Sequence, residues 1–403
     1  MVGKKPNPKS TTLMKSSVLP VIAVDLDHTL VHATNDVPSH AELSENRDSE
    51  YDQMDVFRID ISPNEPREYW VKVRPGARSL LTKLCRMNFT LVACTQGTAT
   101  YAKQLLRVLD PTGSLFGERL IAAQDCSIER PVKTIDGVAA FVGVDPKRVL
   151  VLDDRTDVWR GLNDEATRMR IIRVKPYVWF SGYKREDAYR RVWTLKGIPS
   201  RIYTNMEFDD KTFLYLDRIG DIVVEAWHRS LGTMNGDLFP GLRLVRREIF
   251  GGMRIFLDGF ESHELANECR DAGAILQTEI DESTTHIVTV RPTATAAVEL
   301  ALRRDNILVY TAEWLIECLY CWESLSDDRF IPEYVDRLRK AVATNNTPQA
   351  SSSETRVIQP KPSAKIVSAP KTAQARPTKM KRLPVLEGMK DLPSHPVRKR
   401  KKL

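Results

Sequence analysis

Two aspartates, Asp25 and Asp27, follow the short apolar run 18–24. In an extended strand, residues two apart point to the same face, so the two carboxylates would lie close together. Close carboxylates repel each other unless a cation or a shared proton offsets their charge. Mg²⁺ binds carboxylate oxygens and supports phosphoryl transfer. The pair therefore predicts a phosphoryl-transfer site, and the alternative is a solvated polar end of a strand.

Further polar side chains occur where other predicted strands end. Thr95 closes one apolar run, Asp153 and Asp154 close another, and Lys133 lies between these two elements. Each has an ordinary explanation by itself, such as a helix N-cap for Thr95 or a solvated lysine for Lys133. Their order and their placement at strand ends together favour a phosphoryl-transfer site.

In the chemistry that this set favours, Asp25 attacks phosphorus and forms an aspartyl-phosphate. Asp27 protonates the leaving oxygen and later takes a proton from the hydrolytic water. Mg²⁺, held by Asp25, the Asp27 carbonyl and Asp154, offsets charge between nucleophile and phosphate. Thr95 and Lys133 hold the non-bridging oxygens of the phosphoryl group.

These side chains need a scaffold of alternating strands and helices, and the hydrophobic pattern of the first half predicts one. Short apolar runs of strand type alternate with stretches of helical periodicity. Such alternation favours a doubly wound α/β sheet, which binds ligands beyond the carboxyl ends of its strands. The predicted strands are 18–25, 89–95, 119–123, 148–153 and 170–174, and the predicted helices are 77–87, 98–109 and 133–142.

The chain divides by composition into two folded domains, a connector and two tails. A polar, acidic segment, 33–68, interrupts the first domain and is interpreted as an insertion or lid. The second domain has a β-α-β-β-α-β-α pattern, and both tails are predicted to be disordered. The predicted parts are the basic N-terminus 1–17, the first domain 18–184, a helical connector 185–245, the second domain 246–336 and the basic tail 341–403.

The net charge of +7 is unevenly distributed along the 403 residues. Residues 341–403 carry 14 Lys and Arg against 3 acids, whereas 21–340 carry 42 against 50. Basicity thus belongs to the tails, so nucleic-acid binding by the folded part is not expected. Membrane association is not expected either, because the sequence has no run of about 18 apolar residues and no secretory signal pattern. The six scattered cysteines suit reduced thiols of an intracellular protein.

The motifs of the first domain closely resemble those of the haloacid-dehalogenase (HAD) superfamily, and most closely its Fcp-type phosphatases of the RNA polymerase II C-terminal domain. The nucleophile motif is DLDHTLVHA at 25–33, and KVRPG at 72–76 and CTQG at 94–97 are similarly close. DPTG at 110–113, DDRTDVW at 153–159 and VKPY at 174–177 complete the set. The resemblance implies a Rossmann-like HAD phosphatase fold with an insertion.

The resemblance also implies roles for individual residues. Asp25 would be the nucleophile and Asp27 the acid/base, while Asp154 would be the direct metal ligand with Asp153 beside it. The remaining roles implied are phosphate binding by Thr95 and Lys133, and support of the site or the substrate by Arg74 and Tyr101.

The second domain resembles a BRCT module, a small α/β domain. Gly273 fits its turn, and Trp314 fits its last helix, where a tryptophan packs into the core. The order of phosphatase, helical connector and BRCT domain also matches the Fcp type. BRCT modules that grip phosphoserine usually place Ser or Thr before a glycine after the first strand, but this chain has Asp258 before Gly259. A carboxylate there would repel phosphate, so we expect binding through another face or docking onto the catalytic domain.

The expected function is therefore a Mg²⁺-dependent serine/threonine phosphatase of the RNA polymerase II C-terminal repeat domain, with transcription factors as partners of the BRCT domain. The basic clusters 379–382 and 398–402 are typical of nuclear-import signals or nucleic-acid patches, and predict a nuclear protein. The alternatives are a phosphatase of another nuclear phosphoprotein, a DNA-end phosphatase, and a phospho-binding scaffold with an idle phosphatase domain.

Overall fold

The computed structural model describes most of both predicted domains. Residues 1–18 and 340–403 lie outside the described residues, as do most of 41–67 and all of 181–213. The predictions for the two tails and for the first part of the connector therefore fall outside them. The described residues belong to one compact unit. They are 19–40, 42, 56–60, 68–124, 132–180, 214–233, 236–259, 263–304, 306–326, 328–335 and 337–339.

A five-stranded sheet forms the centre of the first domain. Its strand order is β6-β5-β1-β7-β8, and every neighbouring pair is parallel. The direction of winding reverses beside β1, and ligands of doubly wound sheets bind at such a reversal, beyond the carboxyl ends of the strands. The predicted α/β fold is confirmed. The strands are β1 (Val21–Val24), β5 (Thr90–Thr98), β6 (Leu120–Ala123), β7 (Val149–Asp153) and β8 (Ile171–Arg173).

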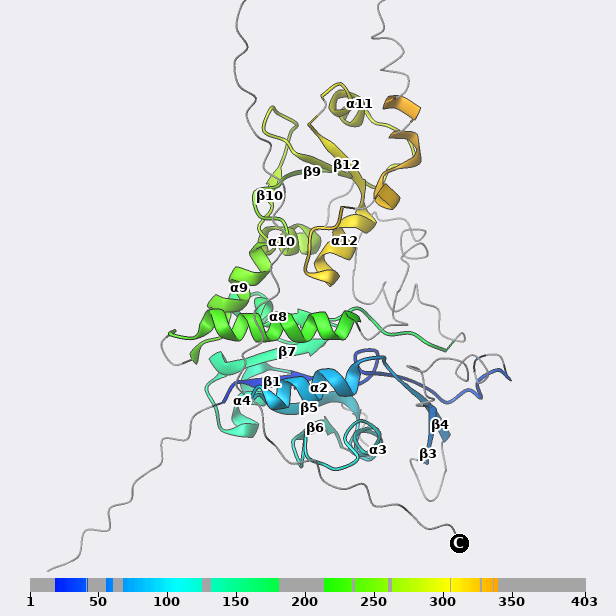
Figure 1. Cartoon of the computed structure of the whole chain (residues 1–403), viewed down its shortest axis with the longest axis vertical. Helices are drawn as coiled ribbons and strands as arrows, with labels where there is room; N and C mark the ends of the chain where they lie inside the picture. Colours follow the sequence, from blue (N-terminus) through cyan, green and yellow to red (C-terminus); the bar gives the residue numbers. More distant parts are fainter. Residues whose placement is uncertain are drawn as a thin grey trace, which may run out of the picture. The chain divides into compact units, whose positions relative to one another are not determined.

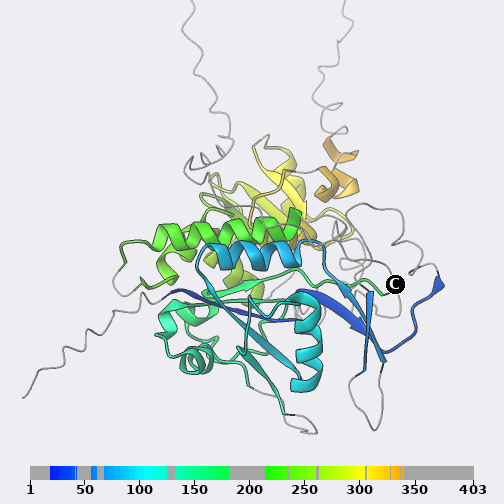
Figure 2. The same ribbon diagram turned by 60° about the horizontal axis from the view of Figure 1, so that its bottom comes forward.

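Helices cover both faces of this sheet because its strands are apolar on both sides (Figure 1). Ile22 and Val24 of β1 share one core cluster with helices α2 (Ala77–Arg86), α3 (Ala99–Leu109) and α8 (Leu214–Ser230). Val21 and Ala23 share the other with α4 (Ile135–Val142). Helices α2 and α8 run side by side in Figure 2, and Lys83 Nζ of α2 lies 2.9 Å from a carboxylate oxygen of Asp217 in α8.

The segment 33–68, predicted as an interruption, contributes strands to a second sheet. Three antiparallel strands lie in the order β2-β4-β3. The sequence pattern does not reveal them, because alternating charged residues such as Arg58 and Asp60 resemble a solvated loop. Within the insertion, 41, 43–55 and 61–67 lie outside the described residues. The strands are β2 (Val31–Thr34), β3 (Val56–Asp60) and β4 (Glu68–Val73).

The second half of the chain has the predicted β-α-β-β-α-β-α series. Its four strands form a parallel sheet in the order β10-β9-β11-β12. Helix α9 (Phe239–Arg247) precedes the series, and the short helix η3 (Asp328–Phe330) follows it. Two further short helices, η1 (Pro146–Arg148) and α5 (Glu165–Met169), belong to the first domain. The series itself consists of β9 (Arg254–Asp258), α10 (His263–Asp271), β10 (Ile275–Gln277), β11 (His286–Thr289), α11 (Ala296–Leu302), β12 (Leu308–Thr311) and α12 (Ala312–Cys321).

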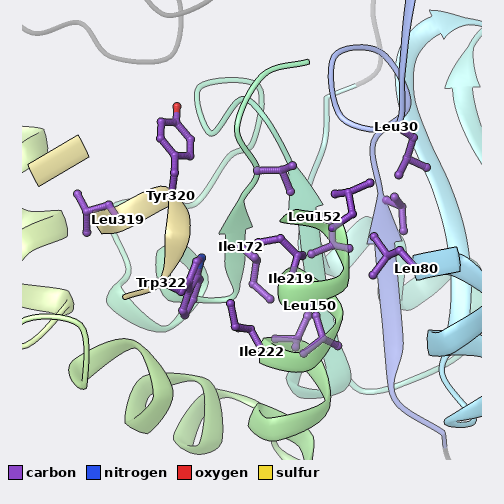
Figure 3. Close-up of a cluster of buried hydrophobic side chains, with 14 of the residues drawn as sticks. Leu30, Leu80, Leu150, Leu152, Ile172, Ile219, Ile222, Leu319, Tyr320 and Trp322 are labelled. Atoms are coloured by element: carbon purple, nitrogen blue, oxygen red, sulfur yellow. The ribbon is translucent and has the colours of Figure 1, made fainter. Parts of the chain in front are cut away.

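One hydrophobic cluster joins the first domain, the connector and the second domain (Figure 3). Leu152 and Ile172 come from the parallel sheet, Ile219 from α8, and Leu319 and Trp322 from α12 and its cap. At about 25 cal/mol per Å² of buried apolar surface, such a cluster is a major source of stability. The two domains of the described chain therefore share one core cluster, and each also has a smaller cluster of its own.

His32 of β2 makes the stability of the first domain sensitive to acid. Its side chain is buried, and its Nδ1 accepts hydrogen bonds from the backbone N–H groups of Trp179 (2.9 Å) and Phe180 (3.0 Å). Burial, aided by the nearby His28, lowers the pKa of His32 to about 3. The unfolded chain binds a proton near pH 6.5 that the folded chain excludes, so stability falls as the pH drops below 6.5.

We expect this group to remove about 2 kcal/mol of unfolding free energy between pH 6.5 and 5, at 1.36 kcal/mol per pH unit. The measurement is the urea unfolding free energy against pH for wild type and for His32→Asn, which keeps an acceptor but does not titrate. His286 also contributes to the pH dependence, because burial lowers its pKa to about 4. Both proteins contain His286, so the difference between their slopes reports His32 alone. Parallel slopes for the two proteins would contradict the prediction.

Candidate active site

Asp25 leaves β1 at the carboxyl edge of the parallel sheet. Its backbone N–H donates to the Leu152 carbonyl of β7 over 2.9 Å, which fixes the residue between these two strands. Asp153 is the last residue of β7, and Asp154 follows it. All three carboxyl groups belong to buried residues. The strand-end placement expected from the sequence is thus found at the point where the sheet winding reverses.

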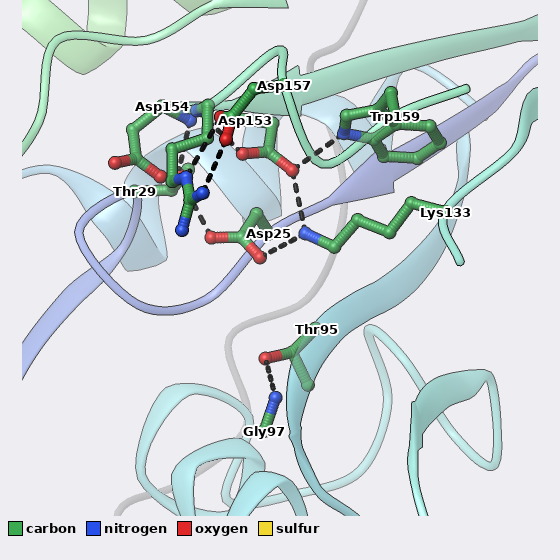
Figure 4. Close-up of polar contacts among 10 residues, drawn as sticks. Asp25, Thr29, Thr95, Gly97, Lys133, Asp153, Asp154, Asp157 and Trp159 are labelled. Atoms are coloured by element: carbon green, nitrogen blue, oxygen red, sulfur yellow. Dashed lines mark hydrogen bonds and ion pairs between the residues drawn. The ribbon is translucent and has the colours of Figure 1, made fainter. Parts of the chain in front are cut away.

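Lys133 bridges two of these carboxylates (Figure 4). Its Nζ lies 2.6 Å from Asp25 Oδ1 and 2.7 Å from Asp153 Oδ2. The predicted helix 133–142 begins later than expected, because the Thr134 hydroxyl accepts from the Gly137 N–H and makes Thr134 the N-cap of α4. Lys133 therefore precedes the helix, and from this position its side chain reaches the aspartates.

The charges of this cluster do not balance among the described residues. Asp25, Asp153 and Asp154 face the single ammonium group of Lys133. Burial, followed by repulsion from Asp153, raises the pKa of Asp25 to about 7, and burial raises the pKa of Asp154 well above its usual value. Burial alone would lower the pKa of Lys133, but the two paired carboxylates outweigh it and raise that pKa.

A divalent cation fits this excess of negative charge. One carboxylate oxygen from each of Asp25, Asp153 and Asp154 lies within 4.8 Å of the others, as ligands of one ion would. Oxygen donors of this kind suit Mg²⁺, which favours carboxylates and water over nitrogen or sulfur. Three of the four residues predicted to bind the metal form this group. The fourth, Asp27, was predicted to bind through its backbone carbonyl, and its carboxyl group is not part of the group.

The carboxyl group of Asp27 instead contacts Tyr101 of α3. The Tyr101 hydroxyl donates to Asp27 Oδ1 over 2.5 Å. The scarcity of water around Asp27 raises the pKa of its carboxyl group, although the hydrogen bond from Tyr101 opposes this rise. Two aspartates of one motif thus have different surroundings: Asp25 is bound to a lysine, and Asp27 to a neutral hydroxyl. Lys133 stabilises the ionised form of Asp25, although burial raises the pKa of both carboxyl groups.

Two residues without a role predicted from the sequence hold the acids in place. The Thr29 hydroxyl lies 3.4 Å from Asp25 Oδ2 and accepts from the Asp154 N–H over 3.0 Å. The Trp159 indole N–H donates to Asp153 Oδ2 over 2.8 Å. Thr29 lies in the motif 25–33 and Trp159 in the motif 153–159. Membership of these motifs is the one feature of the sequence that could have identified them as site residues.

Thr95 and Arg74 have different surroundings. Thr95 lies in β5, the strand next to β1, whereas Arg74 contacts backbone carbonyl groups. Thr95 is buried within β5, which extends to Thr98, and its hydroxyl accepts from the Gly97 N–H over 3.0 Å (Figure 4). Arg74 is also buried, and its Nη1 donates to the carbonyl oxygens of Thr29 (3.2 Å) and Lys175 (2.7 Å). Arg74 thus contacts the backbone behind the cluster.

Comparison with known protein families agrees with this geometry. Residues 20–193 match the model of the NLI interacting factor-like phosphatases, and residues 245–319 match that of the BRCT domain. None of the helices that the structure describes is both long and apolar enough to cross a membrane.

Two curated relatives match across both domains. RNA polymerase II C-terminal domain phosphatase-like 4 of Arabidopsis thaliana is 27% identical over 326 residues, covering 77% of this chain and 69% of the relative. A C-terminal domain phosphatase of RNA polymerase II from Caenorhabditis elegans is 25% identical over 322 residues, covering 77% of this chain. The aligned part spans only 45% of the length of the Caenorhabditis elegans protein.

The fold also matches a solved structure. A structure described as that of an essential RNA polymerase II CTD phosphatase superposes with a TM-score of 0.55 and 24% identity, covering 78% of this chain and 96% of that one. This match confirms the expected Rossmann-like phosphatase fold with a following BRCT domain. The chain therefore joins a domain that matches the NLI interacting factor-like phosphatases to a BRCT domain, and over 77% of its length it is similar to RNA polymerase II C-terminal domain phosphatases.

Proposed function

We propose that this chain is a Mg²⁺-dependent phosphatase that removes phosphate from serine or threonine in the C-terminal domain of RNA polymerase II through an aspartyl-phosphate. The observation that carries the proposal is the buried cluster of three carboxylates around Lys133, with Asp27 beside it. The names of the relatives support the choice of substrate.

In the first step, a carboxylate oxygen of Asp25 forms a bond to phosphorus and the bond from phosphorus to the serine oxygen breaks. The leaving oxygen takes its proton from Asp27, whose raised pKa favours the protonated form. The hydrogen bond from Tyr101 holds this carboxyl group in one orientation. Lys133, already beside Asp25, offsets charge on the phosphoryl oxygens, with Thr95 as a second phosphate-binding group.

In the second step, water attacks the phosphorus of the aspartyl-phosphate and gives its proton to Asp27. The bond between phosphorus and the Asp25 oxygen breaks, which releases inorganic phosphate and restores both carboxyl groups. Asp153 orients Lys133 throughout, because the indole N–H of Trp159 fixes its Oδ2.

Asp25, Asp154 and the backbone carbonyl of Asp27 would hold the metal, with Asp153 beside them. When bound, Mg²⁺ offsets negative charge between nucleophile and phosphate and favours ionised Asp25 at neutral pH. The cluster supports this assignment by its donor type and by its excess of two negative charges over Lys133.

We also propose that the protein acts in the nucleus and that its BRCT domain binds transcription factors through a face other than the usual phosphoserine position. Asp258 Oδ2 at that position accepts hydrogen bonds from the hydroxyls of Thr289 (2.9 Å) and Thr295 (3.1 Å). A buried carboxylate used in this way supports a structural role for Asp258 and disfavours phosphate binding beside it.

The test is phosphate release by the full chain from an aryl phosphate and from a panel of phosphopeptides, with Mg²⁺ or with a chelator. We expect turnover of phosphorylated polymerase repeats to exceed that of unrelated phosphoserine peptides by at least about tenfold. Chelation should abolish turnover, because the carboxylates then lack their counter-charge, and added Mg²⁺ should restore it.

Two of the alternative functions, and the metal assignment, have their own outcomes in this experiment. Equal turnover of unrelated phosphopeptides would indicate another phosphoprotein as the target. Hydrolysis that persists with a chelator would contradict the metal assignment. A complete lack of hydrolysis, combined with tight binding of a phosphopeptide, would indicate a scaffold with an idle phosphatase domain.

A further inference from the structure

Residues 174–180, which follow β8, connect the catalytic residues to the BRCT domain, and we call this segment the strap. On one side the strap binds the loop 25–31, here called the catalytic loop. The Tyr177 N–H donates to the His28 carbonyl over 2.6 Å, and His28 Nδ1 lies 3.0 Å from the Tyr177 carbonyl oxygen. His28 has a left-handed backbone with φ of 61°, which is uncommon for a residue other than glycine. These contacts hold the catalytic loop in an unusual backbone conformation.

Arg74 joins the strap to the residue that holds the catalytic acids. One nitrogen, Nη1, donates both to the Lys175 carbonyl of the strap and to the Thr29 carbonyl of the catalytic loop. The Thr29 side chain in turn contacts Asp25 and the Asp154 N–H. The guanidinium group of Arg74 also lies 4.7 Å from the ring centre of Tyr215 in α8. Because one guanidinium nitrogen binds both carbonyl groups, a displacement of the Lys175 carbonyl would also displace Thr29.

On its other side the strap is bound to helix α12 of the BRCT domain. The Lys175 ammonium lies 2.9 Å from Glu317 Oε2, and both residues are buried. A second route runs through the Tyr215 hydroxyl, which accepts from the Lys175 N–H over 2.8 Å and donates to the Tyr320 carbonyl over 3.4 Å. Burying two charges costs solvation free energy, and removing one partner of such a pair is strongly unfavourable. The pair therefore fixes Lys175 relative to α12.

We propose that helix α12 of the BRCT domain positions the catalytic loop, and that Glu317 is a positioning residue which acts on Asp25 through Lys175, Arg74 and Thr29. The BRCT domain is then part of the catalytic unit as well as a binding module. The kinetic part of this inference rests on the proposed phosphatase function. Its physical basis is that reacting groups must be held to within a fraction of an ångström, and a displacement of about 1 Å can cost about a hundredfold in rate.

The first experiment uses hydrolysis of a small aryl phosphate by the full chain carrying Glu317→Ala. Such a substrate is too small to need recruitment by a BRCT domain, so only positioning can affect it. We expect kcat to fall by about tenfold with KM changed less than about twofold. An unchanged kcat would overturn the proposal.

The matched control is Asp271→Ala, which removes another ion pair between the two domains. Arg168 of α5 donates to Asp271 of α10 over 2.9 and 3.1 Å, but neither residue contacts the strap or the catalytic loop in the described structure. We expect kcat of this variant to stay within about twofold of wild type. Equal losses in both variants would show that domain docking in general matters, and would overturn the specific route through Glu317.

A double-mutant cycle tests whether Glu317 acts through Arg74. If it does, adding Glu317→Ala to Arg74→Lys should lower kcat by less than about twofold further, because the route is already broken. Fully additive losses would overturn the proposal. Should Glu317→Ala fail to fold, Tyr215→Phe replaces it, since it breaks the second route while keeping the ring beside Arg74 and leaving no unpaired charge.

Hydrogen–deuterium exchange gives a readout that does not depend on activity. The N–H groups of Leu30 and Val31 both donate to the Leu26 carbonyl within the catalytic loop. We expect their exchange to be at least about tenfold faster in Glu317→Ala and unchanged in Asp271→Ala. Unchanged exchange in both would overturn the positioning role. A wild type that hydrolyses no phosphate ester would overturn only the proposed function, and this exchange experiment would still decide the inference.

Discussion

Asp25→Asn is expected to lower kcat for phosphate release by at least about 10⁴-fold, because the amide cannot form the covalent intermediate. Losses of about 10⁴ to 10⁶ are typical when a covalent nucleophile is removed from a cooperating set of groups. The measurement is single-turnover phosphate release with saturating Mg²⁺. Retention of more than about one tenth of wild-type kcat would exclude Asp25 as the nucleophile.

The same substitution should stabilise the metal-free protein at pH 8. The pKa of Asp25 is raised to about 7 by burial and by Asp153, so its ionised form is less favourable in the folded chain than in the unfolded chain. The resulting cost grows as the pH rises from about 4 to 7, and asparagine removes it. Asp157→Asn is the matched control, because Asp157 belongs to the neighbouring loop but pairs with Arg155 at the surface. It should change neither kcat nor stability appreciably.

Lys133→Ala is expected to lower both activity and stability. Removing the ammonium leaves the carboxylates of Asp25 and Asp153 without their common partner, and breaking a buried pair typically costs about 3–5 kcal/mol. The loss of a charged group beside the phosphoryl oxygens should lower kcat by about 10²–10³-fold. Thermal unfolding and phosphate release, each with and without Mg²⁺, measure the two effects.

The contrast between the two variants is the decisive result. Asp25→Asn should raise and Lys133→Ala should lower the stability of the metal-free protein, although both lose activity. Added Mg²⁺ should recover part of the stability of Lys133→Ala, because a cation partly replaces the lost positive charge. Full activity of Lys133→Ala would remove it from the set of phosphate-binding residues.

Much of the fold could be predicted because both domains have strong hydrophobic periodicity. Strand β1 is apolar on both faces and ends just before Asp25, which marks a buried parallel strand and its functional end. The strands of the insertion could not be predicted in the same way, because the alternation in β3 places charged residues between apolar ones. The predicted start of α4 is too early, because Lys133 does not by itself distinguish a first helical turn from the residue before the N-cap Thr134.

The acids of the site were predictable from their spacing, but the contacts that position them were not. Thr29 and Trp159 act through single hydrogen bonds to Asp25 and Asp153, and such bonds depend on the relative placement of distant segments. Arg74 was expected to support the site or the substrate, and the structure places it behind the acids on two backbone carbonyls. Periodicity and composition carry no information about such long-range contacts.

The core cluster that extends from Leu30 to Trp322 has a consequence for the timing of protein synthesis (Figure 3). The ribosome adds Asp25 almost 300 residues before it completes α12, which contributes to this core. At about 5–20 residues per second, the interval between them is about 15–60 s. Under the two proposals above, a nascent chain would carry its nucleophile through this interval before α12 can position the catalytic loop, so activity would be delayed until the BRCT domain has been translated.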